Sequence, residues 1–219
     1  MPFFFGRRDG DRVVIEGADA RHLARSLRAR PGERISVVEP GALLSVRLVS
    51  VAADSVTGMV EASRPHDVEP SVRVTVGLAL LPAAALEEAL ARCTELGAWS
   101  FIVISAARSV GRGARLERWS AICREAAMLA GRWHVPSVSG PIAVSELPAD
   151  AVLLDRGAAE PLAALDLGSR SEATLLIGPE GGWTEEEAAR FARRASLGPR
   201  NLRAPNAAAA AVAIALAGR

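Results

Sequence analysis

The chain has 219 residues, half of them hydrophobic, and its 26 basic and 25 acidic side chains give a formal net charge of +1. This length and hydrophobic content fit one large folded domain or two modest ones. The near-zero net charge excludes a uniformly basic, histone-like nucleic-acid binder and an acidic disordered protein. All 26 basic residues are arginine, and lysine and tyrosine are absent. An arginine is therefore a weak marker of function in this sequence unless its neighbours support it.

Short β-like segments, about ten residues apart, dominate the first quarter of the chain. Gly, Pro, Asp and Ala-Asp turns bound each of them, which is typical of a small barrel or sandwich. The predicted strands cover residues 13–15, 35–38, 44–49 and 55–60.

One helix is predicted to interrupt these strands, over residues 19–30. Asp19 is the expected N-cap, and Leu23 and Leu27 lie one turn apart on an expected inward face. Residues 63–71 contain two prolines and mixed charge, which predicts a linker. We therefore expect a domain boundary near residue 70.

Strands and helices alternate after residue 70, and this order predicts an α/β domain with a parallel sheet. Strands are predicted over residues 72–81, 101–104, 152–154, 173–177 and 196–198. Helices are predicted over residues 86–96, 116–131 and 184–195, and over the alanine-rich C-terminal segment.

The two cysteines, Cys93 and Cys123, lie in apolar segments with helical spacing. We expect both to be buried thiols, and we expect neither a disulfide nor a metal site, because the sequence has no Cys/His cluster with ligand spacing. No apolar run resembles a membrane-spanning helix of about 20 residues. The first residues lack a basic leader followed by an apolar segment. These observations predict a cytoplasmic protein with no membrane association.

The sharpest motif is a glycine-rich turn at residues 178–183 (GPEGGW), which follows a predicted strand and precedes a helix. Thr184 and Glu187 have the spacing of a capping box. Ligands bind at such turns in α/β domains because backbone donors and the helix N-terminus converge there. The turn matches neither a Rossmann nor a Walker motif, and Glu180 disfavours a phosphate, so an uncharged or cationic ligand is expected. A tight turn needed only for packing is the alternative.

Together these motifs resemble the ribosomal RNA small subunit methyltransferase E family, whose members methylate N3 of a uridine in 16S ribosomal RNA. The glycine-rich turn and residues 197–203 (LGPRNLR) carry most of the resemblance. Shorter matches occur in the expected order along the whole chain. They are Phe3-Phe4, residues 21–28 with the following Pro-Gly-Glu, residues 94–97, 108–109, 118–119 and 125–127, Arg132 and Pro136.

The resemblance implies a fold and a cofactor. Family members belong to the SPOUT class, so residues 1–70 would form a PUA-like RNA-binding β-barrel and residues 71–219 an α/β methyltransferase domain with a trefoil knot. They act as homodimers through the knotted domain, and they bind S-adenosyl-L-methionine. By position, the cofactor pocket would be lined by Leu154, Ile177, Gly178, Glu180, Gly181, Leu197, Gly198 and Leu202.

The partner implied by the resemblance is 16S ribosomal RNA or the small ribosomal subunit. Two arginine clusters, at residues 21–34 and 108–118, are candidates to bind the phosphates of this RNA. The alternative for each cluster is a solvated surface without a binding role. The expected RNA-binding residues are Arg21, His22, Arg25, Arg28, Arg112 and Arg115. Trp183 is a further candidate to stack on a base, and a tryptophan that covers the helix start is its alternative.

Catalysis at uridine N3 requires loss of a proton and stabilisation of negative charge on the uracil oxygens. An arginine can provide this stabilisation. Arg203 is the first candidate because it follows the second cofactor loop. Arg132 and Arg108 are the next candidates.

The sequence also departs from the family pattern at three places. Residues 204–206 (APN) lack the usual acid and hydroxyl, residues 128–130 (MLA) replace Glu-Gln-Ser, and Pro82 stands at the position of a lysine. Arg92 also stands where relatives usually carry lysine. These departures keep two alternatives open: a SPOUT-fold RNA-binding or ribosome-assembly factor with weakened or lost catalysis, and a related knotted methyltransferase with another RNA target.

Overall fold

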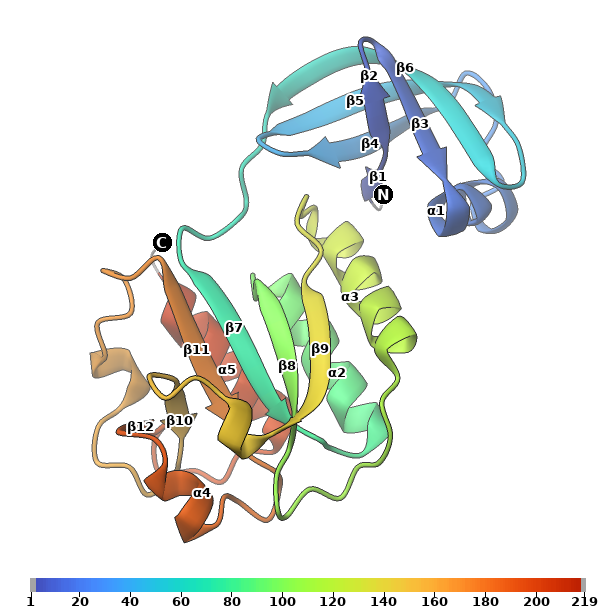
Figure 1. Cartoon of the computed structure of the whole chain (residues 1–219). Helices are drawn as coiled ribbons and strands as arrows, with labels where there is room; N and C mark the ends of the chain where they lie inside the picture. Colours follow the sequence, from blue (N-terminus) through green and yellow to red (C-terminus); the bar gives the residue numbers. More distant parts are fainter. Residues whose placement is uncertain (1–2, 218–219) are drawn as a thin grey trace. The chain divides into compact units, whose positions relative to one another are not determined.

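The computed structural model describes residues 3–217, which form two compact units (Figure 1). The N-terminal unit extends to Glu69 and also includes Ala127–His134. The C-terminal unit comprises Pro70–Ala126 and the chain from Val135 onward. The sequence placed residues 127–134 in the second domain, whereas their contacts in the structure group them with the first unit.

A single six-stranded sheet forms most of the N-terminal unit, in the order β1-β4-β5-β6-β3-β2. All neighbours are antiparallel except β1 and β4. The four predicted strands are present, whereas the short strands β1 and β2 were not predicted. The strands are β1 (Phe3–Phe5), β2 (Arg7–Asp9), β3 (Arg12–Glu16), β4 (Arg34–Glu39), β5 (Ala42–Val51) and β6 (Ser55–Pro65).

The predicted linker begins too early. Strand β6 continues to Pro65, because Ser63, Arg64 and Pro65 pair with the first residues of β5. Proline is tolerated there because it stands at the end of the strand.

The predicted helix over residues 19–30 is also wrong in its extent and its faces. Helix α1 (Gly17–Arg21) is followed by a π-helical turn, η1 (His22–Ser26). Glu16, not Asp19, precedes the helix, and Asp19 is buried within it. Leu23 is buried as predicted, but Leu27 is 47% exposed.

The π-helical turn explains this difference. The Leu27 amide donates to the carbonyl of His22, five residues earlier, so Leu27 is rotated away from the face of Leu23. Arg28 follows with a φ of 53°, in the left-handed region, outside any helix. Three of the expected RNA-binding residues, Arg21, Arg25 and Arg28, therefore do not share one helical face.

The C-terminal unit has a parallel six-stranded sheet, in the order β12-β10-β11-β7-β8-β9. Strand β9 was not predicted, because its sequence contains no apolar run. Its residues alternate between exposed and half-buried positions. The strands are β7 (Arg73–Ala79), β8 (Ser100–Ser105), β9 (Ser137–Ala143), β10 (Val152–Leu154), β11 (Glu172–Ile177) and β12 (Arg193–Ala195).

Both faces of this sheet are buried along its inner strands. Strand residues alternate between two apolar cores, so Leu175 and Ile177 face one core and Leu176 faces the other. Helices α2 (Ala83–Glu95), α3 (Leu116–Ala130) and α5 (Ala204–Leu216) contribute to the first core. Helix α4 (Glu185–Ala189) and the short turn η2 (Val144–Glu146) contribute to the second.

Helix α4 is shorter than predicted. The sequence predicted a helix to residue 195 and a strand at 196–198, but Arg193–Ala195 pair with Val152–Leu154 as strand β12. Ala188 and Phe191 are buried in the second core. Backbone pairing with a distant strand thus overrides the local helical pattern.

Within residues 3–217, no helix has both the length and the apolar character needed to cross a membrane. Cys93 and Cys123 are buried, and both are free thiols, as predicted. Burial raises the pKa of the Cys93 thiol to about 12, with a further contribution from nearby Cys123.

We predict that the protein loses stability between pH 8.5 and 12 because the unfolded Cys93 thiol ionises while the folded one stays protonated. Full stability is present below the unfolded pKa of about 8.5 and is lost as pH rises towards the folded pKa. The chain has no lysine or tyrosine to titrate in this range. The difference in unfolding free energy between pH 7 and pH 10, measured with urea, should be about 2 kcal/mol smaller in Cys93→Ala. An equal difference in the two proteins would contradict this assignment.

Candidate functional site

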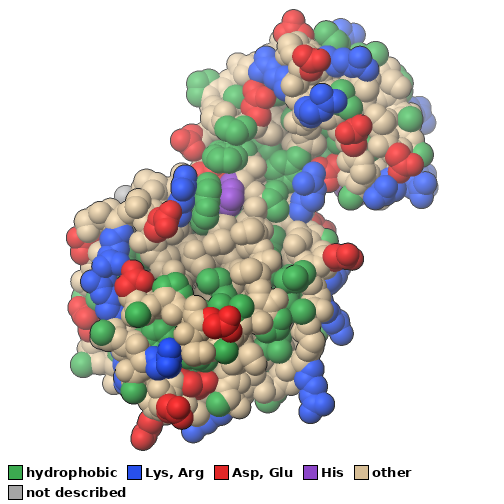
Figure 2. Space-filling view, in the orientation of Figure 1, with side chains coloured by type: hydrophobic (Ala, Val, Ile, Leu, Met, Phe, Trp, Pro, Cys, Tyr) green, Lys and Arg blue, Asp and Glu red, His purple; other side chains and the backbone are tan. Residues whose placement is uncertain are grey.

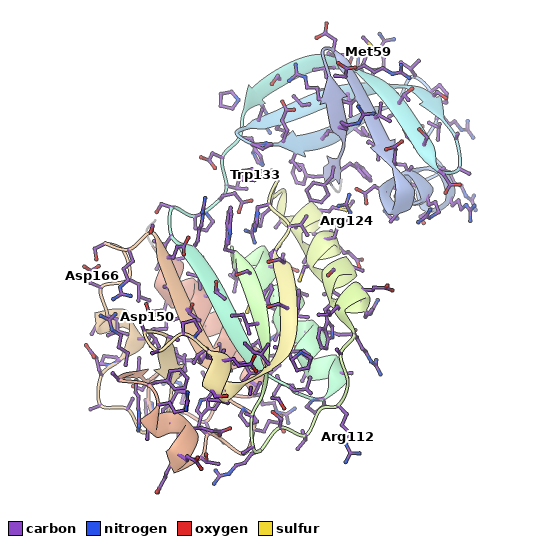
Figure 3. The ribbon with its side chains drawn as sticks, in the orientation of Figure 1. Met59, Arg112, Arg124, Trp133, Asp150 and Asp166 are labelled. Carbon is purple, nitrogen blue, oxygen red and sulfur yellow. The ribbon has the colours of Figure 1, made fainter. Side chains whose placement is uncertain are left out.

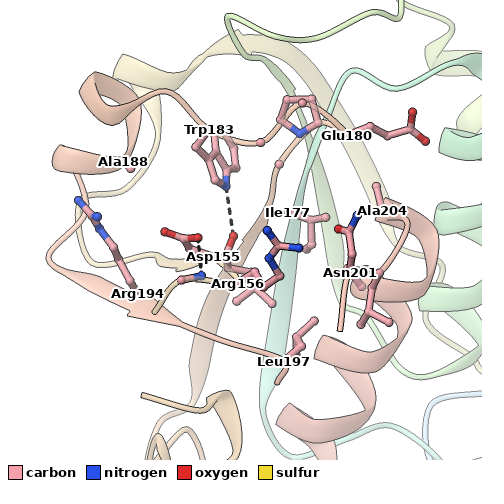
Figure 4. Close-up of a pocket in the computed structure, with 18 of the residues that line it drawn as sticks. Asp155, Arg156, Ile177, Glu180, Trp183, Ala188, Arg194, Leu197, Asn201 and Ala204 are labelled. Atoms are coloured by element: carbon pink, nitrogen blue, oxygen red, sulfur yellow. Dashed lines mark hydrogen bonds between the residues drawn. The ribbon is translucent and has the colours of Figure 1, made fainter. Parts of the chain in front are cut away.

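The loops that follow β10, β11 and β12 converge on one pocket of about 730 Å³ (Figure 4). They meet because the carboxyl ends of parallel strands share one edge of the sheet. All eight residues that the resemblance implies for cofactor binding line this pocket: Leu154, Ile177, Gly178, Glu180, Gly181, Leu197, Gly198 and Leu202.

The pocket also includes residues that were not predicted from the sequence. Three of them, Asp155, Arg156 and Gly157, directly follow β10. They could have been predicted from this position, because ligands bind at the carboxyl ends of parallel strands. Arg194 could not be found in this way, because it was expected in a helix and lies in β12. Further lining residues include Pro179, Trp183, Arg200, Asn201 and Ala204.

Trp183 ties the glycine-rich turn to the neighbouring strand. Its indole Nε1 donates to the Leu154 carbonyl at 3.3 Å, as the dashed line in Figure 4 shows. A Cβ on Gly178 would lie 2.9 Å from that nitrogen, so Gly178 leaves room for the indole. These contacts support the alternative in which Trp183 covers the start of the helix. They also explain why residue 178 is a glycine, since a side chain there would collide with the indole.

Arg108 contacts the same turn from the loop between β8 and α3. Its Nη1 donates to the Gly181 carbonyl at 2.8 Å and to the Trp183 carbonyl at 3.4 Å. The sequence proposed this residue for catalysis, but its guanidinium is engaged with the main chain of the turn.

Glu187 links the start of α4 to the same β8–α3 loop. Its Oε2 accepts from the Thr184 amide at 2.9 Å, and the Thr184 hydroxyl accepts from the Glu187 amide at 3.1 Å, so the predicted capping box is confirmed. Its Oε1 also accepts from the Ala107 amide at 2.7 Å. This second bond was not predictable, because Ala107 lies 80 residues away in the chain.

Arg203 precedes α5 as its N-cap residue, with φ −65° and ψ 150°. Its neighbours Leu202 and Ala204 line the pocket, and Arg203 itself is exposed beside them. Of the three arginines proposed for catalysis, Arg203 is thus the one whose side chain stays exposed next to the pocket without a partner within residues 3–217.

The family departure at residues 204–206 leaves the start of α5 intact. Pro205 stands in the first turn of the helix, where proline needs no hydrogen bond. The Asn206 Oδ1 accepts from the Arg92 Nη1 at 2.6 Å, which joins α5 to α2. Arg92 also pairs with Glu88 at 2.5 Å.

Arg132 belongs to the N-terminal unit, and its side chain is committed to a buried ion pair. It is 2% exposed, and its Nε and Nη2 donate to the Glu69 Oε2 at 3.0 and 2.6 Å. The other Glu69 oxygen accepts from the His134 amide at 3.1 Å. We assign Arg132 a structural role, because breaking such a buried pair would leave an unpaired charge.

The candidate RNA-binding residues of the N-terminal unit differ in their availability. Arg21 pairs with Asp54 at 3.0 Å, and the ring of His22 lies 6.3 Å from that of Phe4. Arg25 and Arg28 are exposed, and neither guanidinium has an ion-pair partner among residues 3–217. Figure 2 shows arginines interspersed with acidic side chains over the visible face of this unit.

The β8–α3 loop carries the candidates of the C-terminal unit. Arg112 and Arg115 are exposed, and Figure 3 shows Arg112 projecting away from the ribbon. In the described part of the chain, neither has an ion pair. Arg118, at the end of this cluster, pairs with Glu87 at 2.9 Å and is less available.

Comparison with known proteins agrees with the pocket. Residues 68–216 match the RNA methyltransferase domain family. A ribosomal RNA small subunit methyltransferase E from Mycobacterium bovis is 33% identical over 222 residues, which cover 91% of this chain and 84% of the relative. The chain belongs to the ribosomal RNA small subunit methyltransferase E family.

Other members of the family support this assignment. The Synechocystis sp. protein of the same name is 30% identical over 92% of this chain and 71% of its own length. The crystal structure of the Neisseria gonorrhoeae enzyme, bound to S-adenosyl methionine, matches with a TM-score of 0.84 at 27% identity. That match covers 97% of this chain and 95% of the crystallised one, so this chain has the α/β methyltransferase fold of the family.

We predict that Glu187→Gln destabilises the turn, because the glutamine NH₂ would face the donor of either Ala107 or Thr184, whose amides bind different oxygens of Glu187. The loss should be about 1–3 kcal/mol in unfolding free energy, with faster hydrogen exchange over residues 106–109 and 178–184. Glu186→Gln is the matched control, since Glu186 is exposed in the same turn of α4. Equal effects of the two substitutions would contradict the role assigned to Glu187.

Proposed function

We propose that this protein transfers a methyl group from S-adenosyl-L-methionine to N3 of a uridine in 16S ribosomal RNA. The observation that carries the proposal is the pocket at the carboxyl edge of the parallel sheet, lined by all eight residues implied by the family resemblance. Membership in the methyltransferase E family gives the reaction class.

The residues of the pocket fit the cofactor. Its volume of about 730 Å³ lies within the usual range for small-molecule sites. Leu154, Ile177, Leu197 and Leu202 supply apolar walls, and the glycine-rich turn supplies main-chain polar groups. The bound cofactor would supply a methyl group on a positively charged sulfur. Asp155, Glu180 and Glu185 border the pocket together with Arg156, Arg194 and Arg200, and this balance of charges suits a ligand that carries both positive and negative groups.

Arg203 is the residue we propose for catalysis. The N3 position of uridine carries a proton, so negative charge develops on the ring and its carbonyl oxygens as that proton leaves. A guanidinium placed beside the pocket would stabilise this charge. The pocket and the RNA-binding surface would contribute by holding the base in position.

For the RNA, we propose contacts from Arg25, Arg28, Arg112 and Arg115. These side chains are exposed, and within residues 3–217 they have no carboxylate partner to displace. The binding energy would come from contacts between these arginines and the RNA phosphates. The affinity would therefore fall as the salt concentration rises. We propose small-subunit ribosomal RNA in the cytoplasm as the target.

Three finer features of the family belong to the same proposal. The N-terminal unit would act as a PUA-like RNA-binding barrel, the C-terminal unit would contain a trefoil knot, and two copies would form a dimer through it. The order of the sheet supports a knot, because β12 pairs with β10 on the side opposite β11 and α5 then returns to β7, β11 and α2. The small exposed residues Asn206 and Ala213 of α5 are compatible with a close helix partner.

Mapping of methylated uridines in ribosomal RNA tests the proposed function. RNA from a strain that lacks this gene should have lost N3-methyluridine at one small-subunit position, and a plasmid copy of the gene should restore it. Mass spectrometry of nuclease fragments locates the position. N3-methyluridine that persists undiminished in the deletion strain would refute the proposal.

We predict that Arg203→Ala lowers methylation by at least about 100-fold, because the charge that develops on the uracil would lose its partner. Cofactor affinity, measured by calorimetry, should change by no more than a few-fold, since Arg203 stands outside the pocket lining. Arg190→Ala is the control, because Arg190 is exposed on the far end of α4 and contacts the Ser145 carbonyl. A large loss of cofactor affinity in Arg203→Ala would show that Arg203 binds the cofactor.

A further inference from the structure

The loop between β8 and α3 is fixed against the end of β7. The Gly111 amide donates to the Leu80 carbonyl at 3.0 Å, and a Cβ on Gly111 would collide with the Leu81 carbonyl. Within the loop, the Ser109 hydroxyl accepts from the Ala106 amide at 3.2 Å. Arg108 therefore projects from a loop whose backbone is bound on both sides of it.

From this base, Arg108 contacts the glycine-rich turn with its whole side chain. Its Cβ and Cδ lie 3.4 Å from the position of a Cβ on Gly181, so the aliphatic stem packs on that residue. Its Nη1 reaches the carbonyls of Gly181 and Trp183. Hydrogen bonds from a charged donor are stronger than those from a neutral one.

The turn needs such external support. It is closed internally by the bond from the Gly182 amide to the Pro179 carbonyl at 2.8 Å, and Gly182 has a φ of 72°. Adjacent glycines have the greatest backbone freedom of any residues, and ordering them costs entropy. Arg108 holds the carbonyls of Gly181 and Trp183, the residues before and after Gly182.

We propose that Arg108 is a positioning residue that holds the glycine-rich turn in its cofactor-binding conformation and thereby sets the affinity for S-adenosyl-L-methionine. This proposal rests on the proposed function for the identity of the ligand. It replaces the catalytic role that the sequence suggested for Arg108, because the contacts of the guanidinium are to the main chain of the turn.

A positioning role predicts a separation between binding and turnover. Arg108→Ala should weaken cofactor binding by about tenfold or more, as expected for the loss of hydrogen bonds from a charged group. Its kcat at saturating cofactor, on small subunits from the deletion strain, should stay within about threefold of the parent. Arg108→Lys keeps a stem and a cationic donor, so it should recover most of the affinity.

Arg112→Ala is the matched control for cofactor binding. Arg112 lies in the same loop, but it makes no hydrogen bond to the turn in the described part of the chain. Its removal should leave cofactor affinity unchanged by calorimetry. Hydrogen exchange of the ligand-free protein gives a second readout: amides of residues 181–184 should exchange faster in Arg108→Ala and at the parent rate in Arg112→Ala.

Two results would overturn the proposal. The first is parental cofactor affinity in Arg108→Ala together with a large loss of kcat, which would restore the catalytic role. The second is unchanged hydrogen exchange of the turn in Arg108→Ala. If the parent protein itself binds no S-adenosyl-L-methionine, the proposed function fails, and the exchange experiment still decides whether Arg108 holds the turn.

Discussion

The glycine-rich turn after β11 is the constraint on which the site depends, because it is held from two opposite directions. Trp183 binds the Leu154 carbonyl at the end of β10, and Arg108 and Glu187 bind it to the loop after β8. Gly111 joins that loop to the end of β7. The carboxyl ends of four parallel strands are therefore connected by hydrogen bonds, and this network shapes the pocket before any ligand enters it.

The departures from the family pattern at residues 204–206 and 128–130 are accommodated by local contacts. Pro205 occupies a helix position where no amide donor is needed, and Asn206 finds a new partner in Arg92. Met128 is buried in the apolar core of the N-terminal unit, whereas Leu129 is 62% exposed. The departures at residues 204–206 thus keep the start of α5 in place.

The arginines of this chain divide into structural and available ones. Arg132 is buried with Glu69, Arg21 and Arg118 pair with carboxylates, and Arg108 binds main-chain carbonyls. Cationic sites on a chain with a net charge of only +1 therefore come from the arginines outside these bonds. Arg203 and Arg112, like Arg25, Arg28 and Arg115, are exposed without an ion pair among residues 3–217, a property that no count of arginines reveals.

Features that depend on a local pattern of residues could be predicted from the sequence. The buried strands β7, β8, β10 and β11, the Thr184–Glu187 cap and the burial of both cysteines follow from apolar runs and from spacings of a few residues. The eight pocket positions could be found from the family motifs. The folded structure was needed to find the end of α4, the strand β12, the exposure of Leu27 and the partners of Arg108 and Arg132. Each of these depends on a hydrogen bond or ion pair that is not visible as a periodic pattern in the sequence, and most of those bonds join residues far apart in the chain.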